Sequence, residues 1–186
     1  MNVNTFFHMS YGVYVVSALD QGRPVGCVAN SIMQVSVAPA TVAVSINHDN
    51  YTHKCIVREG KFAFSILSEQ SNPQMIGIFG FRSGKDMDKF AEIPYTMKQG
   101  LPVITDSCGY VTCKVVDTME TKTHTVFLGE VMDADVFHTA APAMTYAYYH
   151  NVIKGKSPKN APTYLQEVKG DAPVKKTGRW ECQVCG

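Results

Sequence analysis

The segment ANSIMQVSVAPATVAVSINHDNYTHKCI, residues 29 to 56, places small polar side chains at the ends of apolar runs and beside a helix start. Hydroxyl, amide and backbone N–H donors that gather near a helix N-terminus suit an anionic group such as a phosphate. Asn, Ser and Thr also cap strands and helices through bonds to the nearby backbone, which is their commoner use. Residue types alone leave both interpretations open. The polar positions are Asn30, Ser31, Ser36, Ser45, Asn47 and Thr52.

A second candidate for chemistry is the terminal WECQVCG, in which Cys182 and Cys185 form a Cys-x-x-Cys pair. Such a pair fits a thioredoxin-like redox motif, half of a zinc site or half of an iron site. The thioredoxin interpretation needs a βαβ context, which is missing here. Four other cysteines stand singly in apolar segments, as buried thiols do, so they are not expected to complete the site. They are Cys27, Cys55, Cys108 and Cys113.

Composition limits what the chain can be. Its 186 residues are 45% hydrophobic and 18% charged, with a formal net charge of +1, as in an ordinary globular protein. The near-neutral charge gives no reason to expect binding to nucleic acid or to acidic membranes. No apolar run approaches the ~18 residues of a membrane span, and the first residues do not form a signal peptide. We therefore expect a cytoplasmic protein with reduced thiols.

The elements that must position the polar residues read mainly as strands. YGVYVVSAL, residues 11–19, is followed by a turn-like DQGR and then by residues 24–30, which predicts a β-hairpin. Alternating apolar and polar residues predict four more strands. These cover residues 41–47, 61–67, 109–118 and 124–136.

Helical signals are fewer. Residues 51–59 follow Asn50, a residue suited to an N-cap, and end before Gly60. Residues 73–81 follow Asn72 and begin with a proline at the first helical position. Strands dominate, and no βαβ rhythm is present. The sequence therefore predicts a mainly antiparallel β-barrel with a few flanking helices.

The character of the chain changes from Lys154 onward, where lysines, glycines and prolines replace apolar periodicity. The sequence predicts a main domain over residues 1–168, because Tyr164, Leu165 and Val168 can still pack on the barrel. Residues 169–178 are predicted to be a linker. Residues 179–186 are predicted to begin a second domain.

Several of these motifs, in this order, resemble the flavin reductase-like, FMN-binding split-barrel family, close to its flavoredoxin-type members. The resemblance covers residues 1–168 and rests on residues 29–39, 44–52, 79–93 and 123–136. It implies a six-stranded antiparallel split barrel, a homodimer and one FMN per protomer near the dimer interface.

The resemblance also implies which residues bind FMN. One group, Asn30, Ser31 and Ile32, would lie along the isoalloxazine, with Ser36 nearby. A second group would meet the ribityl chain and the phosphate; it comprises Ser45, Asn47, Asn50, Tyr51 and Thr52. A third group supplies phosphate contacts and comprises Ser83, Lys85 and Lys89. His124 takes the place of a histidine near the flavin, although Lys122-Thr123-His124 replaces the Gly-Asp-His of many members.

The tail resembles the opening of a rubredoxin, in which an aromatic strand leads into Cys-x-x-Cys-Gly. The second Cys pair of a rubredoxin comes about thirty residues later, beyond Gly186 in this sequence. Together with the upstream domain, the tail resembles the junction of proteins that fuse a flavin reductase to a rubredoxin. We therefore expect a chain cut within its second domain, with Cys182 and Cys185 as half of an iron site. Two tails of a dimer could alternatively share one zinc or iron ion.

The function implied by the resemblance is an NAD(P)H:flavin/rubredoxin oxidoreductase. NAD(P)H would reduce FMN, and the electrons would pass to a rubredoxin iron and on to an acceptor such as a flavodiiron protein. No catalytic side chain is expected, because the flavin accepts the hydride and the protein orients it. No GxGxxG motif follows a strand, so the nicotinamide would stack directly on the flavin. The alternatives are a free-flavin or ferric-complex reductase and a non-catalytic flavin-binding protein.

Overall fold

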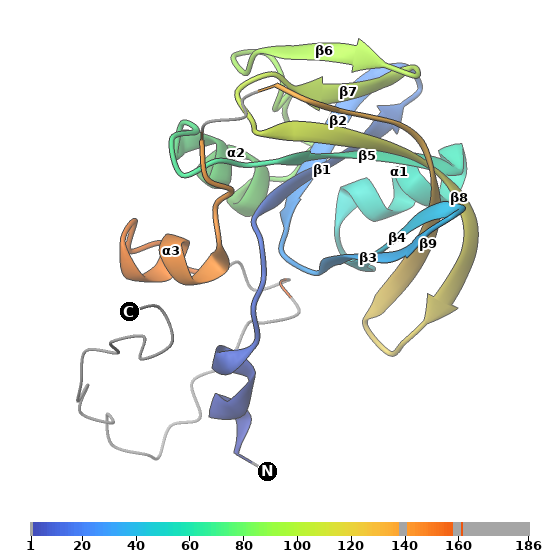
Figure 1. The fold of residues 1–186 in the computed structure, drawn as a ribbon. Helices are drawn as coiled ribbons and strands as arrows, with labels where there is room; N and C mark the ends of the chain where they lie inside the picture. Colours follow the sequence, from blue (N-terminus) through green and yellow to red (C-terminus); the bar gives the residue numbers. More distant parts are fainter. Residues whose placement is uncertain (1, 138–140, 158–160, 162–186) are drawn as a thin grey trace.

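A computed structural model describes residues 2–137, 141–157 and 161. Its main feature is a seven-stranded, strongly curved antiparallel sheet in the order β2-β1-β5-β8-β9-β4-β3 (Figure 1). Its strands are β1 (Tyr14–Asp20), β2 (Arg23–Ala29), β3 (Ile32–Val37), β4 (Ala40–Asn47), β5 (Lys61–Ile66), β8 (Gly109–Glu120) and β9 (His124–Val136). A separate hairpin pairs β6 (Tyr95–Lys98) with β7 (Leu101–Ile104). The helices are the 3-10 helix η1 (Val3–His8) and the α-helices α1 (Tyr51–Glu59), α2 (Gln74–Phe81) and α3 (Tyr146–Asn151).

The predicted fold class, mainly β with flanking helices, is confirmed, but the predicted count of six strands was one short for this sheet. The missing strand is β3, which pairs with β4 at the sheet edge. Most β3 side chains are exposed, and the register shifts between Gln34 and Ser36, so no clean alternation marks the strand in the sequence. The edge position and the irregular pairing of β3 together explain why the alternation of apolar and polar residues did not predict this strand.

The first hairpin closes through a two-residue turn. Gln21 and Gly22 have φ values of 51° and 89°, the left-handed conformations required at both central positions of a type I′ turn. Asp20 and Arg23 are therefore directly paired across the ends of β1 and β2. The turn fixes an acid and a base side by side at this corner of the sheet.

Helix α1 closes the open side of the curved sheet. Its Cys55 and Ile56 are buried in the same apolar cluster as residues of β1, β2, β4, β5, β8 and β9. The predicted bounds are confirmed: the Asn50 side chain accepts a hydrogen bond from the Thr52 N–H at 3.2 Å, and Gly60 ends the helix in the left-handed conformation. Because α1 follows β4 after three residues, its first turn lies beside the end of that strand.

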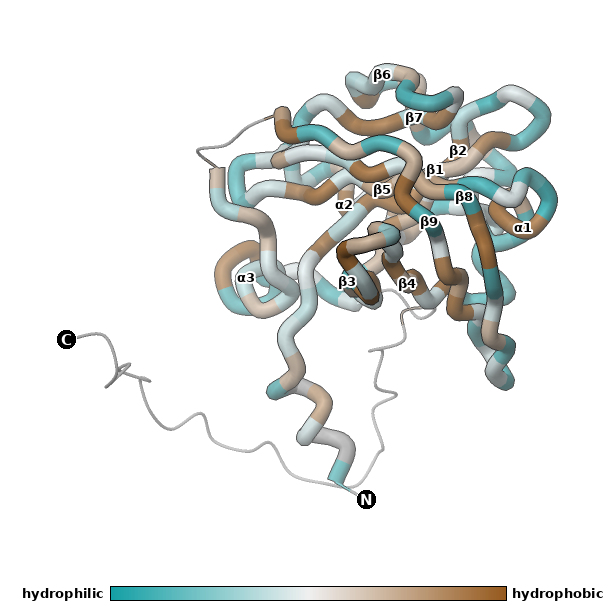
Figure 2. Tube along the Cα trace, turned by 45° about the vertical axis from the view of Figure 1, so that its right-hand side comes forward, coloured by the Kyte–Doolittle hydropathy of each residue, from teal (hydrophilic) through white to brown (hydrophobic). Residues whose placement is uncertain are grey.

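Helix α2 begins at Gln74, one residue later than predicted, and Asn72 supports its start by accepting from the Gln74 N–H at 3.0 Å. Together with α3 it packs on a second apolar cluster. Figure 2 shows hydrophobic positions recurring along the strands and α1, whereas the tip of the β8–β9 hairpin is mostly hydrophilic. None of the helices in the described part of the chain has the length and apolar character of a membrane span.

Candidate functional site

The β3–β4 pair forms a continuous strip that holds the first group of predicted site residues. Asn30 is buried, and the Ser31 hydroxyl donates to its side-chain oxygen at 3.0 Å. The Ser31 carbonyl accepts from the Ser45 N–H at 3.0 Å, and Ile32 pairs with Val44 in the next register position. Residues far apart in the sequence signature are therefore neighbours on two adjacent strands.

The strip ends where β4 meets β9 and α1. Asn47 pairs with His124 across β4 and β9, so the structure brings the predicted histidine beside the predicted ribityl and phosphate residues. The Asn47 side chain accepts from the Asp49 N–H at 2.9 Å, which shapes the turn into α1. The His124 ring Nδ1 lies 2.8 Å from the Thr123 hydroxyl. These bonds hold the histidine at the turn end of the β8–β9 hairpin.

The first turn of α1 carries the positive end of the helix dipole and the Thr52 hydroxyl, while its Thr52 and His53 N–H groups are bonded to Asn50. The first N–H groups of a helix have no partner within the helix, and its dipole favours negative charge there. Thr52 is only 1% exposed, and the first turn contains no acidic side chain. This end of the strip is chemically suited to a phosphate.

Residues 82–89 pack against this helix start. Gly84 is buried, and a β-carbon placed on it would lie 3.7 Å from the Tyr51 ring and 3.8 Å from Lys89 Cε. Ser83 and Lys85 are exposed at the same bend, where the Ser83 hydroxyl accepts from the Lys85 N–H at 3.2 Å. The second and third groups of predicted residues therefore meet around the first turn of α1.

Lys89 is buried, unlike Lys85. Its ammonium donates to the carbonyls of Gly26 at 3.0 Å and of Phe79 at 3.1 Å, and it lies 5.9 Å from the centre of the Phe79 ring. Burial lowers the pKa of the Lys89 ammonium, and the nearby Cys27 thiol acts in the opposite direction. Lys89 thus ties residues 82–89 to β2 and α2 from beneath.

Replacing Lys89 by methionine is expected to lower the free energy of unfolding at neutral pH by about 1–3 kcal/mol, because two buried carbonyls lose their donor. Burial holds the folded-state pKa of Lys89 below its ordinary value of 10.5. Between the folded-state pKa and the ordinary value, the unfolded chain binds more protons at Lys89 than the folded protein does. The contribution of this lysine to the free energy of unfolding therefore rises with pH in that range. Urea denaturation at several pH values should show that the difference in free energy of unfolding between the wild type and Lys89→Met grows as the pH approaches 10.5. The exposed Lys85→Met serves as the control, and equal effects of both substitutions would contradict the buried role.

A network of histidines next to α1 was not predicted from the sequence. The Thr125 hydroxyl donates to Glu120 at 2.9 Å and lies 2.7 Å from His53 Nε2, while His48 Nε2 lies 3.1 Å from Glu120. Because the hydroxyl proton goes to the carboxylate, His53 donates from Nε2. Burial, followed by the neighbouring His48, lowers the pKa of His53 and favours its neutral form. The network joins α1 to the β8–β9 hairpin.

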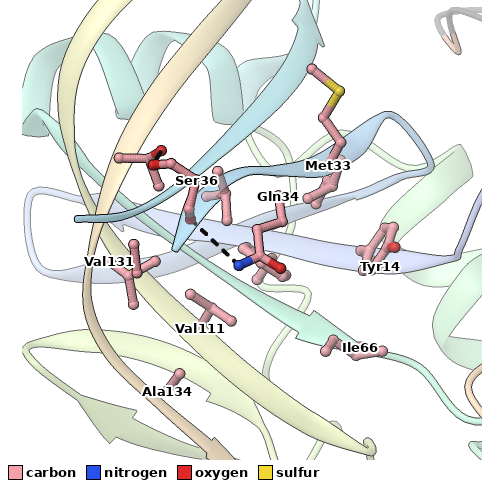
Figure 3. A pocket seen from close by; sticks show the side chains of 13 residues that line it. Tyr14, Met33, Gln34, Ser36, Ile66, Val111, Val131 and Ala134 are labelled. Carbon is pink, nitrogen blue, oxygen red and sulfur yellow. Dashed lines mark hydrogen bonds between the residues drawn. The ribbon is translucent and has the colours of Figure 1, made fainter. Parts of the chain in front are cut away.

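An apolar pocket of about 350 Å³ opens beside the other end of the strip. Figure 3 shows Val111, Val131 and Ala134 below the strand that bears Gln34 and Ser36. The volume falls within the ~300–1,000 Å³ usual for small-molecule sites. Its walls come from β1, β3, β4, β5, β8 and β9, with these residues: Tyr14, Ile32, Met33, Gln34, Ser36, Ala40, Thr41, Val42, Phe64, Ile66, Val111, Val131 and Ala134.

The predicted residues thus fall into two places. Ile32 and Ser36 line the apolar pocket, and the Ser36 hydroxyl donates to the Pro39 carbonyl at 2.6 Å. Asn30 and Ser31 directly precede Ile32 on the strip, and the others gather at the Asn47 end and around the start of α1. An apolar pocket at one end and anion-binding groups at the other fit a flat aromatic group linked to a phosphate.

The match to a known family agrees with this arrangement. Residues 6–156 match the flavin reductase like domain. The chain belongs to this family. Its membership confirms the predicted split-barrel class and the prediction of a flavin-using oxidoreductase.

Relatives extend the comparison. The chain is 38% identical over 187 residues to a high molecular weight rubredoxin of Moorella thermoacetica, covering 100% of this chain and 81% of that protein. It is also 38% identical to a ferric-chelate reductase (NAD(P)H) of Archaeoglobus fulgidus, covering 89% of this chain and 99% of that protein. Among solved structures, the NADH:FAD oxidoreductase SgcE6 of Streptomyces globisporus aligns with a TM-score of 0.70 at 26% identity, covering 76% of this chain and 84% of that chain.

The predicted iron ligands Cys182 and Cys185 lie outside the described residues, as do Tyr164, Leu165 and Val168. Within the described residues, no group of three or more His, Cys, Asp or Glu side chains is arranged to hold a metal ion. Cys27, Cys55 and Cys113 are buried free thiols, as expected for single cysteines in apolar segments, whereas Cys108 is partly exposed.

Proposed function

We propose that the protein is an FMN-dependent NAD(P)H oxidoreductase that passes electrons on to a rubredoxin iron centre. The observation that supports it best is the meeting of residues 82–89 with the first turn of α1, at one end of a strip whose other end borders an apolar pocket. In the proposal, the donors of the helix start hold the FMN phosphate. The apolar end accepts the ring system.

The protein's own part in the reaction is binding and orientation. The Thr52 hydroxyl, at the first turn of α1, donates to the phosphate, with Ser83 and Lys85 at its outer side. Asn30 and Ser31 lie along the isoalloxazine, and His124 contacts the flavin or the nicotinamide. When bound, FMN would supply the hydride and one-electron chemistry. No side chain has to transfer a proton at the reacting atom.

The acceptor side of the proposal rests on the tail. Cys182 and Cys185 are half of a rubredoxin-type iron site, in a domain that begins at residue 179 after the linker 169–178. The 38% identity to a high molecular weight rubredoxin across the whole chain supports this route. A homodimer, a flavodiiron-type final acceptor and a cytoplasmic location remain predictions of the family resemblance.

A ferric-complex reductase is the second candidate. It is favoured by the 38% identity to a ferric-chelate reductase that the chain matches over 99% of that protein's length. In this case the electrons would leave the flavin for a small diffusible iron complex.

Anaerobic titration of the FMN-loaded protein with NADH and then NADPH tests the proposal. We expect the oxidised flavin band to bleach, and the more effective nucleotide identifies the donor. Oxidised rubredoxin or ferric EDTA is then added to the reduced protein. The acceptor that restores the oxidised flavin band faster is the one that the protein prefers. A flavin band that stays oxidised with both nucleotides would contradict the oxidoreductase. Failure to bind FMN would contradict the cofactor assignment, and preferential binding of FAD would correct it.

A further inference from the structure

A charged pair at the turn between β1 and β2 reaches across to the candidate phosphate end. Arg23 Nη2 donates to Asp20 Oδ2 at 3.0 Å, as the two residues face each other across the type I′ turn. The Asp20 side chain is largely buried, with 16% of its surface exposed, whereas 35% of Arg23 is exposed. The turn therefore holds the Arg23 guanidinium against the Asp20 carboxylate, which is itself largely shielded from solvent.

The same guanidinium binds the backbone of residues 82–89. Arg23 Nη2 donates to the Gly84 carbonyl at 2.9 Å, and Nη1 approaches the Met87 carbonyl at 3.5 Å. Gly84 lies between Ser83 and Lys85, the two exposed residues assigned to the phosphate. Arg23 consequently fixes the backbone from which these side chains project.

The carboxylate of the pair holds the start of α1. The Tyr51 hydroxyl donates to Asp20 Oδ2 at 2.7 Å, and Arg58 donates to Oδ1 at 3.1 Å from the last turn of the helix. The Tyr51 and Arg23 bonds are the leading causes that lower the pKa of Asp20, so this carboxyl is ionised at neutral pH. One carboxylate thus connects the two segments that meet at the phosphate end.

We propose that Asp20 and Arg23 are positioning residues for cofactor binding, which hold residues 83–85 against the first turn of α1 in the geometry that receives the phosphate. This inference rests on the proposed function, since it deepens the phosphate assignment. An exposed ion pair alone contributes little. This pair is part of a network that joins the β1–β2 turn, α1 and residues 82–89, so its effect is expected on binding geometry more than on folding.

The test compares FMN with riboflavin, which lacks the phosphate, by titrating apoprotein and following flavin fluorescence. In Arg23→Gln, FMN affinity is expected to fall about tenfold, as for loss of one hydrogen bond to a charged group, while riboflavin affinity is unchanged. Arg23→Lys should recover part of the loss, because an ammonium can reach one of the two partners but cannot fork. Equal losses for both flavins, or no loss for either, would overturn the inference.

Arg58→Gln is the matched control. Arg58 binds Asp20 but is not among the residues that bond to residues 82–89, so both affinities should stay as in the wild type. Melting temperatures are measured for every variant, and Asp20→Asn, which keeps the shape of the side chain, replaces Arg23→Gln if the latter does not fold. A wild type that binds FMN no better than riboflavin would overturn the phosphate assignment and the inference together. A wild type that prefers FMN, with Arg23→Gln and Asp20→Asn unaffected, would overturn the inference alone.

Discussion

Phe62→Ala is expected to lower the free energy of unfolding by about 3–5 kcal/mol, the range for deleting a fully buried phenylalanine. Phe62 is 0% exposed and pairs with Cys113 on β8. A β-carbon placed on Gly129 of β9 would lie 2.7 Å from the tip of the Phe62 ring, so the ring fills the space above that glycine. Such packing leaves a cavity when the ring is removed. Urea denaturation followed by circular dichroism measures the difference in free energy of unfolding between Phe62→Ala and the wild type.

Phe62→Leu is the control, since it retains much of the apolar volume and should cost less than the alanine substitution. Gly129→Ala in the Phe62→Ala background offers a second check. The added methyl group clashes with the ring and also lies 2.8 Å from Cys113 Cβ, so removing the ring relieves part of the clash and the cost of the substitution should shrink. If Phe62→Ala unfolds at the wild-type urea concentration, the ring is not part of this core.

The regular elements could be predicted because their signals are local. Residues 51–59 form α1 with the predicted ends, since Asn50 and Gly60 supply the caps that the sequence shows. The hairpin around Gln21-Gly22 follows from its turn residues. The strand Ile32–Val37 was missed because its pairing is irregular and its side chains are mostly exposed. A strand held at a sheet edge by its partner leaves little pattern of its own.

The site was predictable only in part, and for a related reason. The family resemblance located the polar signature, and the structure brings Asn47, His124 and the start of α1 together. The Asp20–Arg23 pair was read only as a turn, because its bond to Gly84 crosses 61 residues of sequence. The bond between His48 and Glu120 crosses 72 residues. Such contacts depend on the fold, so residue spacing alone cannot reveal them.

Thr52→Val is expected to weaken FMN binding about 10- to 150-fold and to leave riboflavin binding unchanged, if the α1 start holds the phosphate. The hydroxyl would form a hydrogen bond to a charged group, which contributes about 1.5–3 kcal/mol. Thr52 is 1% exposed, and valine keeps the shape of its side chain, so the substitution removes the hydroxyl with little other change. Fluorescence titration of the apoprotein with each flavin gives both affinities.

Thr112→Val is the matched control, because this threonine is 0% exposed on β8 and bonds to the Asp133 carbonyl, away from the start of α1. It should lose stability, as any buried threonine does on losing its hydroxyl bond, without changing the preference for FMN. A loss of riboflavin affinity in Thr52→Val equal to that for FMN would mean that the substitution distorts the whole strip. Unchanged FMN affinity would place the phosphate elsewhere, with residues 83–85 the next segment to test, because the exposed Lys85 offers the remaining positive charge assigned to that end.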